Sequence, residues 1–222
     1  MAIGDFANAT TFGATAIGIN AAGSGNQSFA ISNSTASGQR AIALGNCTAS
    51  ATDSLAIQGG NASAQNATAI GIGASANRFG LRASANGIFA AAGDAQRAGW
   101  VLRNKTTNNT PTTLFADGSS TRLTITSGKI LFADILITGI KSDGTAAACY
   151  KRKVAIKNVG GTTSLVGSVE TISTDIEDNA GTDVAITADD TNDALQINVT
   201  GITSETWRWV AVVEGLEIAY GT

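Results

Sequence analysis

The dipeptide Ala-Ile recurs six times within the first seventy residues of the chain. Its isoleucines follow one another at spacings of 14, 14, 11, 15 and 13 residues, and they are Ile3, Ile17, Ile31, Ile42, Ile57 and Ile70. Self-similarity at a short, nearly fixed period is typical of architectures in which each repeat contacts only its neighbours. We therefore expect a stacked solenoid with repeats of about 14 residues.

Each repeat contains almost only small and polar residues between its isoleucines, as in TAIGINAAGSGNQS and LAIQGGNASAQN. At about 3.3 Å per residue, such a unit is long enough for two short strands and two tight turns. Glycine and asparagine accept the left-handed backbone angles that tight turns require. The composition therefore predicts a thin β-coil rather than a helical repeat.

A single coil of this kind is too poor in apolar bulk to fold alone. Ordering each residue costs about 1 to 2 kcal/mol of backbone entropy, whereas burying one isoleucine and a few alanines returns only about 3 to 5 kcal/mol. Backbone ladders between coils recover part of the difference. We expect partner chains to cover the six isoleucines, so that these residues form the repeat core and the contact surface of a homotrimer.

The sequence argues against three other structures for this segment. A helical solenoid needs leucine and alanine at helical spacing over a period above about thirty residues, and a hexapeptide β-helix needs coils of about eighteen residues. A disordered stalk would share the richness in Ala, Ser, Gly and Asn. The regular return of isoleucine argues against the stalk.

The units TAIGINAAGSGNQS and TAIGIGASANR resemble the repeats in the head domains of trimeric autotransporter adhesins, which also occur in bacteriophage fibres. The resemblance covers residues 1 to about 90. It implies a left-handed parallel β-roll in which three chains lie side by side with their isoleucines pointing inward. Two units depart from the pattern, because Ser32 and Gln58 stand where the repeat has glycine after isoleucine.

The composition changes near residue 92, and we place a domain boundary there, with a repeat domain over 1–92 and a second domain over 93–222. Beyond it, short β-branched and apolar runs alternate with turn signals such as Ala-Asp-Gly-Ser, a pattern that indicates an all-β domain. We expect a jelly-roll-like antiparallel β-sandwich. The order of its segments is similar to that of sandwich modules in phage fibres and head-decoration proteins.

Two tryptophans, Trp207 and Trp209, share one face of the last predicted strand. Exposed indoles can stack on sugar rings, but indoles at alternate positions of a sandwich strand are more often core residues. We therefore interpret them as core or interface residues. Arg208, between them, can pair with a carboxylate.

The chain contains no histidine, which excludes histidine-based acid–base catalysis, serine triads and the usual zinc sites. We expect Cys47 and Cys149 to be unbridged. Two acidic runs, around 175–183 and 189–193, are predicted to be solvated turns without aromatic or arginine neighbours. A calcium ion is the alternative for the second run. We predict no enzymatic activity, catalytic residue, cofactor or metal site.

The only basic cluster in the sequence is YKRKVAIKN. On a strand, Lys151, Lys153 and Lys157 would share one face, with Arg152 on the other. The cluster predicts either a charged strand that resists aggregation or a contact with anionic cell-surface polysaccharide or with an acidic capsid surface. The three lysines are our candidate ligand contacts. With a net charge of −3, we expect no nucleic acid partner.

The sequence encodes neither a long apolar run nor a hydrophobic leader, so we expect no membrane insertion and no export signal. This favours a phage protein made in the host cytoplasm over an autotransporter. The leading hypothesis is a virion-surface fibre or spike that attaches to host cells, an adhesin-like homotrimer bound to other virion proteins. A trimeric capsid-decoration or head-fibre protein is the alternative, and a polysaccharide depolymerase is a weaker one.

Overall fold

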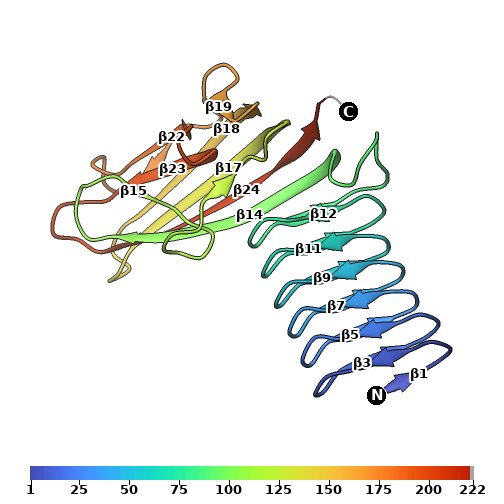
Figure 1. Ribbon diagram of the computed structural model, residues 1–222. Coiled ribbons are helices and arrows are strands. Elements are labelled where there is room, and N and C mark those ends of the chain that lie inside the picture. The colour runs from blue at the N-terminus through green and yellow to red at the C-terminus, as the bar shows by residue number, and fades with distance from the viewer. Residues whose placement is uncertain (221–222) are drawn as a thin grey trace. The chain divides into compact units, whose positions relative to one another are not determined.

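The computed structural model describes residues 1–220, which form strands and turns throughout (Figure 1). The described chain divides into two compact units, which are treated separately below. The first comprises Met1–Ala98 together with Glu217–Tyr220, and the second comprises Gly99–Leu216. None of the described residues forms a helix that could span a bilayer.

The first unit is a parallel β-solenoid, in which each coil adds one strand to each of two sheets (Figure 1). The first sheet contains β1 (Ala2–Ile3), β3 (Thr15–Ile17), β5 (Phe29–Ile31), β7 (Ile42–Leu44), β9 (Leu55–Ile57), β11 (Thr68–Ile70) and β13 (Arg82–Ser84). The second contains β2 (Asn8–Ala9), β4 (Ala22–Gly23), β6 (Thr35–Ala36), β8 (Thr48–Ala49), β10 (Asn61–Ala62) and β12 (Ser75–Ala76). The predicted thin coil of two strands and two turns is confirmed.

The interior of the solenoid is filled almost entirely by alanine and residues of similar size. The middle residue of each three-residue strand in the first sheet points inward, and Ala16, Ala30, Ala43, Ala56 and Ala69 are all 0% exposed. The space between the two sheets is narrow. A Cβ placed on Gly60, for example, would lie 2.5 Å from the carbonyl oxygen of Ala69. Small residues are therefore a steric requirement of this fold rather than a sign of disorder.

The turns of each coil require left-handed backbone conformations at the same place in successive repeats. One such row follows the outer isoleucines: Gly18 and Gly71 have φ of 100° and 94°, and the two departures from the glycine pattern, Ser32 and Gln58, have φ of 52° and 53°. The departures therefore adopt the turn of the repeat. Other left-handed residues support one another between coils, since Arg40 and Asp53 form a bidentate ion pair at 2.6 and 2.7 Å.

Replacing Gln58 by glycine should stabilise the solenoid by about 0.5–1 kcal/mol, because the left-handed conformation is unfavourable for a residue with a Cβ and not for glycine. The measurement is the free energy of unfolding at fixed protein concentration. The matched control is Thr35→Gly in β6, where φ is not positive and the same change should destabilise. A lower stability for Gln58→Gly would contradict the argument.

The last coil is closed by side chains from both ends of the first unit. The Gln96 amide accepts a hydrogen bond from the Ser75 N–H at 2.9 Å and donates one to the Ser75 carbonyl at 3.2 Å, as a further strand would. Gln96 Nε2 also donates to Glu217 at 3.2 Å. Glu217 is 1% exposed and pairs with Arg78. These contacts satisfy the backbone N–H and carbonyl groups of Ser75 at the edge of β12, and they bury an ion pair there.

The second unit consists of antiparallel sheets. The larger has the order β14-β24-β17-β18-β19, with β20 and β21 also paired to β18, and the smaller has the order β15-β23-β16, with β22 paired to β23. The strands are β14 (Ala95–Thr106), β15 (Thr112–Thr113), β16 (Leu123–Thr124), β17 (Lys129–Lys141), β18 (Ala147–Val159), β19 (Thr162–Leu165), β20 (Glu170–Thr171), β21 (Ile176–Glu177), β22 (Asp183–Asp189), β23 (Ala194–Thr200) and β24 (Trp207–Ala219). The predicted all-β fold, a solenoid followed by antiparallel sheets, is confirmed.

The two tryptophans of β24 are core residues. Trp207 and Trp209 are 0% and 1% exposed, and their rings stack with centroids 5.6 Å apart. Trp209 Nε1 donates a hydrogen bond to Thr106 Oγ1 at 3.1 Å, and Trp207 Nε1 donates to Glu205 at 2.9 Å. This confirms the core interpretation and leaves neither indole face available to a sugar ring. Gly139 in β17 leaves room for the Trp209 ring, because a Cβ there would lie 2.3 Å from it.

Candidate functional site

The isoleucines of the repeat lie outside the coil and not in its interior. In each three-residue strand of the first sheet the central alanine is buried, while both flanking side chains point outward. The parallel register aligns six of the outward residues in one row, called here the outer ladder: Ile3, Ile17, Ile31, Leu44, Ile57 and Ile70. Ile3 and Ile70 are 54% and 44% exposed, and the other four are half-buried.

The structure corrects the position of Ile42 in this pattern. Ile42 is aligned with Phe29 and Leu55 on the other flank of the buried alanine, and Leu44 occupies the ladder position. Spacings along the outer ladder are therefore 14, 14, 13, 13 and 13 residues, without the apparent slips of 11 and 15. The signal that could have revealed this was Ala43, which keeps the period of the buried alanines.

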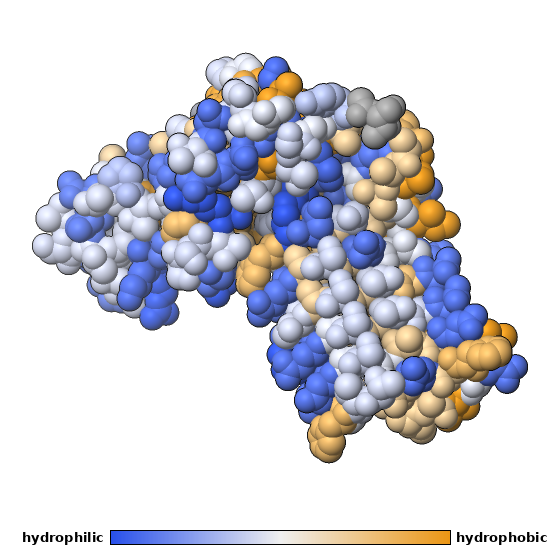
Figure 2. Space-filling model, in the orientation of Figure 1, coloured by the Kyte–Doolittle hydropathy of each residue, from blue (hydrophilic) through white to orange (hydrophobic). Residues whose placement is uncertain are grey.

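Exposed apolar side chains on the solenoid stand beside small, nearly neutral ones, as Figure 2 shows. Ile42 is 39% exposed in the row beside the outer ladder, and Ile19 and Ile72, two residues beyond ladder positions, are 62% and 63% exposed. Exposed apolar patches are typical of interaction sites. The solenoid thus presents a row of partly exposed apolar side chains along its first sheet.

The three candidate lysines share one face of β18, as the alternation predicted. Lys151 and Lys153 are half-buried and Lys157 is exposed. Lys153 Nζ lies 3.9 Å from Asp134 Oδ1 and 5.7 Å from the centroid of the Phe132 ring, both on the neighbouring strand β17. The strand therefore brings the lysines into one row, and one of them already contacts a carboxylate. Their role in ligand binding stays a prediction.

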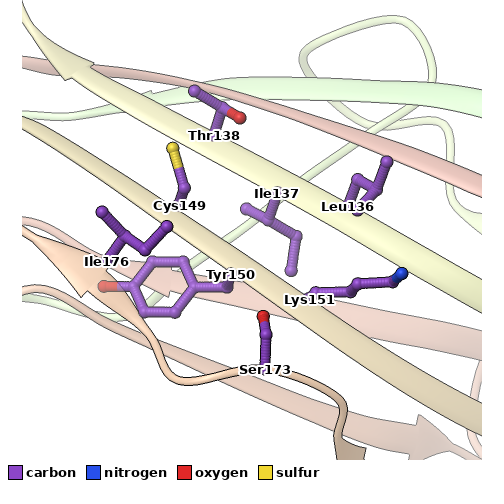
Figure 3. A pocket seen from close by; sticks show the side chains of 8 residues that line it. All are labelled: Leu136, Ile137, Thr138, Cys149, Tyr150, Lys151, Ser173 and Ile176. Carbon is purple, nitrogen blue, oxygen red and sulfur yellow. The ribbon is translucent and has the colours of Figure 1, made fainter.

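A shallow cavity of about 280 Å³ lies beside Lys151. Figure 3 shows its lining, which comes from β17, β18 and the segment that leads into β21: Leu136, Ile137, Thr138, Cys149, Tyr150, Lys151, Ser173 and Ile176. Leu136 and Ile176 are 52% and 70% exposed, and Cys149 is a free thiol, as is Cys47. The lining offers mainly apolar contact, with a single ammonium group.

Two members of the first acidic run, Asp175 and Glu177, have arginine and aromatic neighbours, which corrects the expectation for them, whereas Asp178 and Asp183 are exposed. Arg152, buried on the inner face of β18, donates two hydrogen bonds to the Asp175 carboxylate at 2.6 and 2.8 Å, and its guanidinium lies 5.4 Å from the Tyr150 ring centroid. These bonds hold the pKa of Asp175 below its usual range. The Tyr150 hydroxyl donates a hydrogen bond to Glu177 at 2.6 Å. The pKa of Tyr150 is raised mainly by burial and to a smaller extent by this hydrogen bond.

The second acidic run is likewise tied to neighbouring strands. Asp189 pairs with Arg122 at 3.1 Å, Asp190 accepts the Thr163 N–H at 2.5 Å, and Asp193 accepts the Thr163 hydroxyl at 2.8 Å. The carboxylates thus fix the loop between β22 and β23. Over residues 1–220, no three Cys, Asp or Glu side chains gather in an arrangement that would hold a metal ion.

The fold defines the class of this protein as an all-β protein with a parallel β-solenoid followed by antiparallel sheets. No protein-family model matches the sequence. No curated protein matches it either.

In structure, the chain is distantly similar to phage tailspike proteins. The tailspike protein gp49 of Acinetobacter baumannii bacteriophage Fri1, a capsular polysaccharide depolymerase, aligns with a TM-score of 0.35 and 9% identity over 90% of this chain and 40% of that one. The tailspike protein of Acinetobacter phage vB_ApiP_P1 aligns with a TM-score of 0.32 and 12% identity over 98% of this chain and 52% of that one. The tailspike protein of Acinetobacter baumannii phage AM24 aligns with a TM-score of 0.32 and 9% identity over 92% of this chain and 47% of that one. The chain spans about half the length of these proteins.

Proposed function

We propose that this chain is a structural protein of a bacteriophage virion, a homotrimeric fibre or spike that mediates attachment to the host cell surface. The observation that carries the proposal is the outer ladder, which keeps an apolar residue at the same position in six successive coils. The sequence resemblance of the repeat units to adhesin heads and phage fibres supplies the number of copies, three, and the viral setting.

The composition of the coil explains why copies would associate. The interior buries alanine rather than large side chains, so each coil gains little from its own core. A partly exposed isoleucine gains about 1 kcal/mol when a neighbouring chain covers the rest of it, at about 25 cal/mol per Å². Summed along six ladder positions in each chain, this gain matches the size of a typical net folding stability.

Attachment follows from the presentation of identical second units on one trimer. Three copies joined by a common solenoid bind a repetitive surface with one bimolecular step, after which the other contacts are intramolecular. Weak individual sites are then sufficient for stable attachment. The lysine row of β18 is one candidate contact in this scheme.

Replacing Leu44 by aspartate should convert the trimer into monomers, because it places three carboxylates against an apolar interface where no cation neutralises them. The measurement is the mass by light scattering, which should fall from three times 22.3 kDa to one. Thr35→Asp, on an exposed strand position of the second sheet, should leave the mass unchanged. A wild-type protein that is monomeric at micromolar concentration would contradict the proposal.

The setting and role are tested on particles and cells. Gold-labelled antibodies against the chain should mark the tail of intact virions, and the purified trimer should bind host cells and block infection. Labelling of the capsid, with no binding to cells, would instead support the alternative of a capsid-decoration or head-fibre protein. Incubation with host polysaccharide, followed by chain-length measurement, tests the depolymerase alternative.

A further inference from the structure

A second shallow cavity, of about 480 Å³, lies on the larger sheet of the second unit and is distinct in its lining from the one beside Lys151. Its lining comes from β14, β24 and the loop that follows β15: Arg103, Asn104, Lys105, Asp117, Gly118, Arg208, Trp209 and Val210. Three cations meet in this cavity, two from β14 and one from β24, which is about a hundred residues further along the chain. The sequence cluster of β18 contributes none of them.

Strand alternation places these cations on the exposed face of the sheet. Arg103 and Lys105 are two residues apart in β14, and both are exposed, as is Arg208 of β24. Trp209, the neighbour of Arg208, points the other way and is buried. The three cationic side chains therefore face solvent beside one cavity, over strands that are hydrogen-bonded neighbours.

The guanidinium of Arg103 is held in place by the protein. Its Nη1 donates to the Ala116 carbonyl at 3.2 Å and its Nη2 to the Asp117 carbonyl at 2.7 Å. Gly118 allows this approach, because it has φ of 84° and a Cβ there would lie 3.0 Å from Arg103 Nε. A cation oriented in advance loses less entropy when it binds an anion.

The one carboxylate in the lining is occupied by its own loop. Asp117 accepts the backbone N–H groups of Ser119, Ser120 and Thr121, each at 2.9 Å, and it also accepts the hydroxyl groups of the same three residues. These bonds hold the pKa of Asp117 well below its usual range, so it stays charged without pairing a cation. Within residues 1–220, neither Lys105 nor Arg208 forms an ion pair with a carboxylate.

We infer that this cavity binds an anionic group carried on a saccharide. Its lining has three positive charges and one negative, in a chain whose net charge is −3, so the positive potential is local to the cavity. Guanidinium groups recognise carboxylate and phosphate oxygens with paired hydrogen bonds. The open shape admits a sugar unit within a longer chain. A nucleic acid would need a longer basic surface along its backbone.

The inference names the ligand class and the site for the proposed attachment, and its link to host cells rests on that proposed function. The test is calorimetric titration of the full chain with trigalacturonate, with its methyl ester as the uncharged control and glucose 1-phosphate as the phosphate arm. Trigalacturonate or glucose 1-phosphate should bind, more weakly as salt is added, and the ester should not. The two anions distinguish a carboxylate source from a phosphate source.

Arg208→Gln and Lys105→Gln should each weaken the binding of the anionic sugar about ten-fold, as expected for the loss of a charge-assisted hydrogen bond. Arg82→Gln, an equal change of charge at an exposed position of β13 in the first unit, should change it less than about two-fold. Equal losses in all three variants, equal binding of the ester, or tighter binding of an oligothymidylate through Arg208 would overturn the inference.

The same variants separate this inference from the proposed function. If trigalacturonate binds through Arg208 but the protein neither binds host cells nor blocks infection, the anion site stands and the attachment role fails. If the protein binds host cells while neither anionic sugar binds it, the anion site fails and the attachment role stands.

Discussion

Replacing Ala43 by leucine should unfold much of the solenoid, with a loss of about 3 kcal/mol or more in its free energy of unfolding. Ala43 is 0% exposed and lies between Ala30 and Ala56 of the adjacent coils, which are also fully buried. Overpacking a core typically costs about 1–3 kcal/mol. The narrow separation of the two sheets leaves no direction in which the larger side chain can move, so the upper end applies.

The measurement is hydrogen exchange of the backbone amides, followed by mass spectrometry of peptides. Because each coil contacts only its neighbours, exchange should accelerate in the coils around residue 43 and less in distant ones. Thr35→Leu, which adds a similar apolar side chain at an exposed position, should change stability by no more than about 0.5 kcal/mol. If the amides of the Ala43→Leu variant exchanged as slowly as those of the wild type, the interior would not be too narrow for leucine, and the prediction would be wrong.

The second large effect is expected from Arg78→Ala, which should destabilise the last coil by about 3–5 kcal/mol. The change removes the cation that pairs with the Glu217 carboxylate, which is only 1% exposed, and removing one partner of a buried ion pair is strongly unfavourable. Exchange should accelerate for the amides of residues 68–84.

Two further variants show whether charge burial is the cause. Arg40→Ala removes another arginine–carboxylate ion pair of the solenoid, but its side chains are 48% and 35% exposed, so it should cost at most about 1 kcal/mol. Adding Glu217→Gln to Arg78→Ala should restore part of the stability, because the neutral amide needs no counter-charge. Equal effects of Arg40→Ala and Arg78→Ala would show that burial is irrelevant here.

Local sequence patterns predicted the elements of this fold well. Recurring small residues with glycine and asparagine predicted coils of two strands and two turns. Strict alternation predicted the buried face of β24, where Ala211 and Val213 accompany the tryptophans and are 0% exposed. The same alternation placed Lys151 and Arg152 on opposite faces of β18. These features depend on backbone geometry over a few residues, and the local pattern of residue types in the sequence predicts that geometry directly.

The register of the repeat was predicted only in part, for a physical reason. The Ala-Ile dipeptide identifies a strand, but the steric constraint acts on the inward position, which must be small, whereas the two outward positions accept Ile, Leu, Phe or Thr. At 41–44 the sequence Ala-Ile-Ala-Leu offers two alignments. Only the one with Ala43 inside keeps the stacking of neighbouring coils.

Partners distant in sequence could not be predicted. Arg152 finds Asp175 because two short strands return along the edge of β18, and Arg103 meets Arg208 because β14 and β24 are neighbours in the sheet. Charge clusters in the sequence therefore indicated the lysine row and missed the cationic cavity. Pairings of this kind depend on sheet order, which composition and periodicity do not specify.

The closure of the last coil by the Gln96 amide has an implication for how such a protein changes over time. The side chains that terminate the ladder contact the final coil, while every earlier coil meets only copies of the same small-residue frame. Gain or loss of whole coils of 13 or 14 residues therefore leaves the closure of the last coil intact. Each added or lost coil changes the length of the solenoid by about 4.8 Å, the spacing of neighbouring strands. The length of the solenoid can thus change in evolution by duplication of a repeat unit, without substitutions at either end.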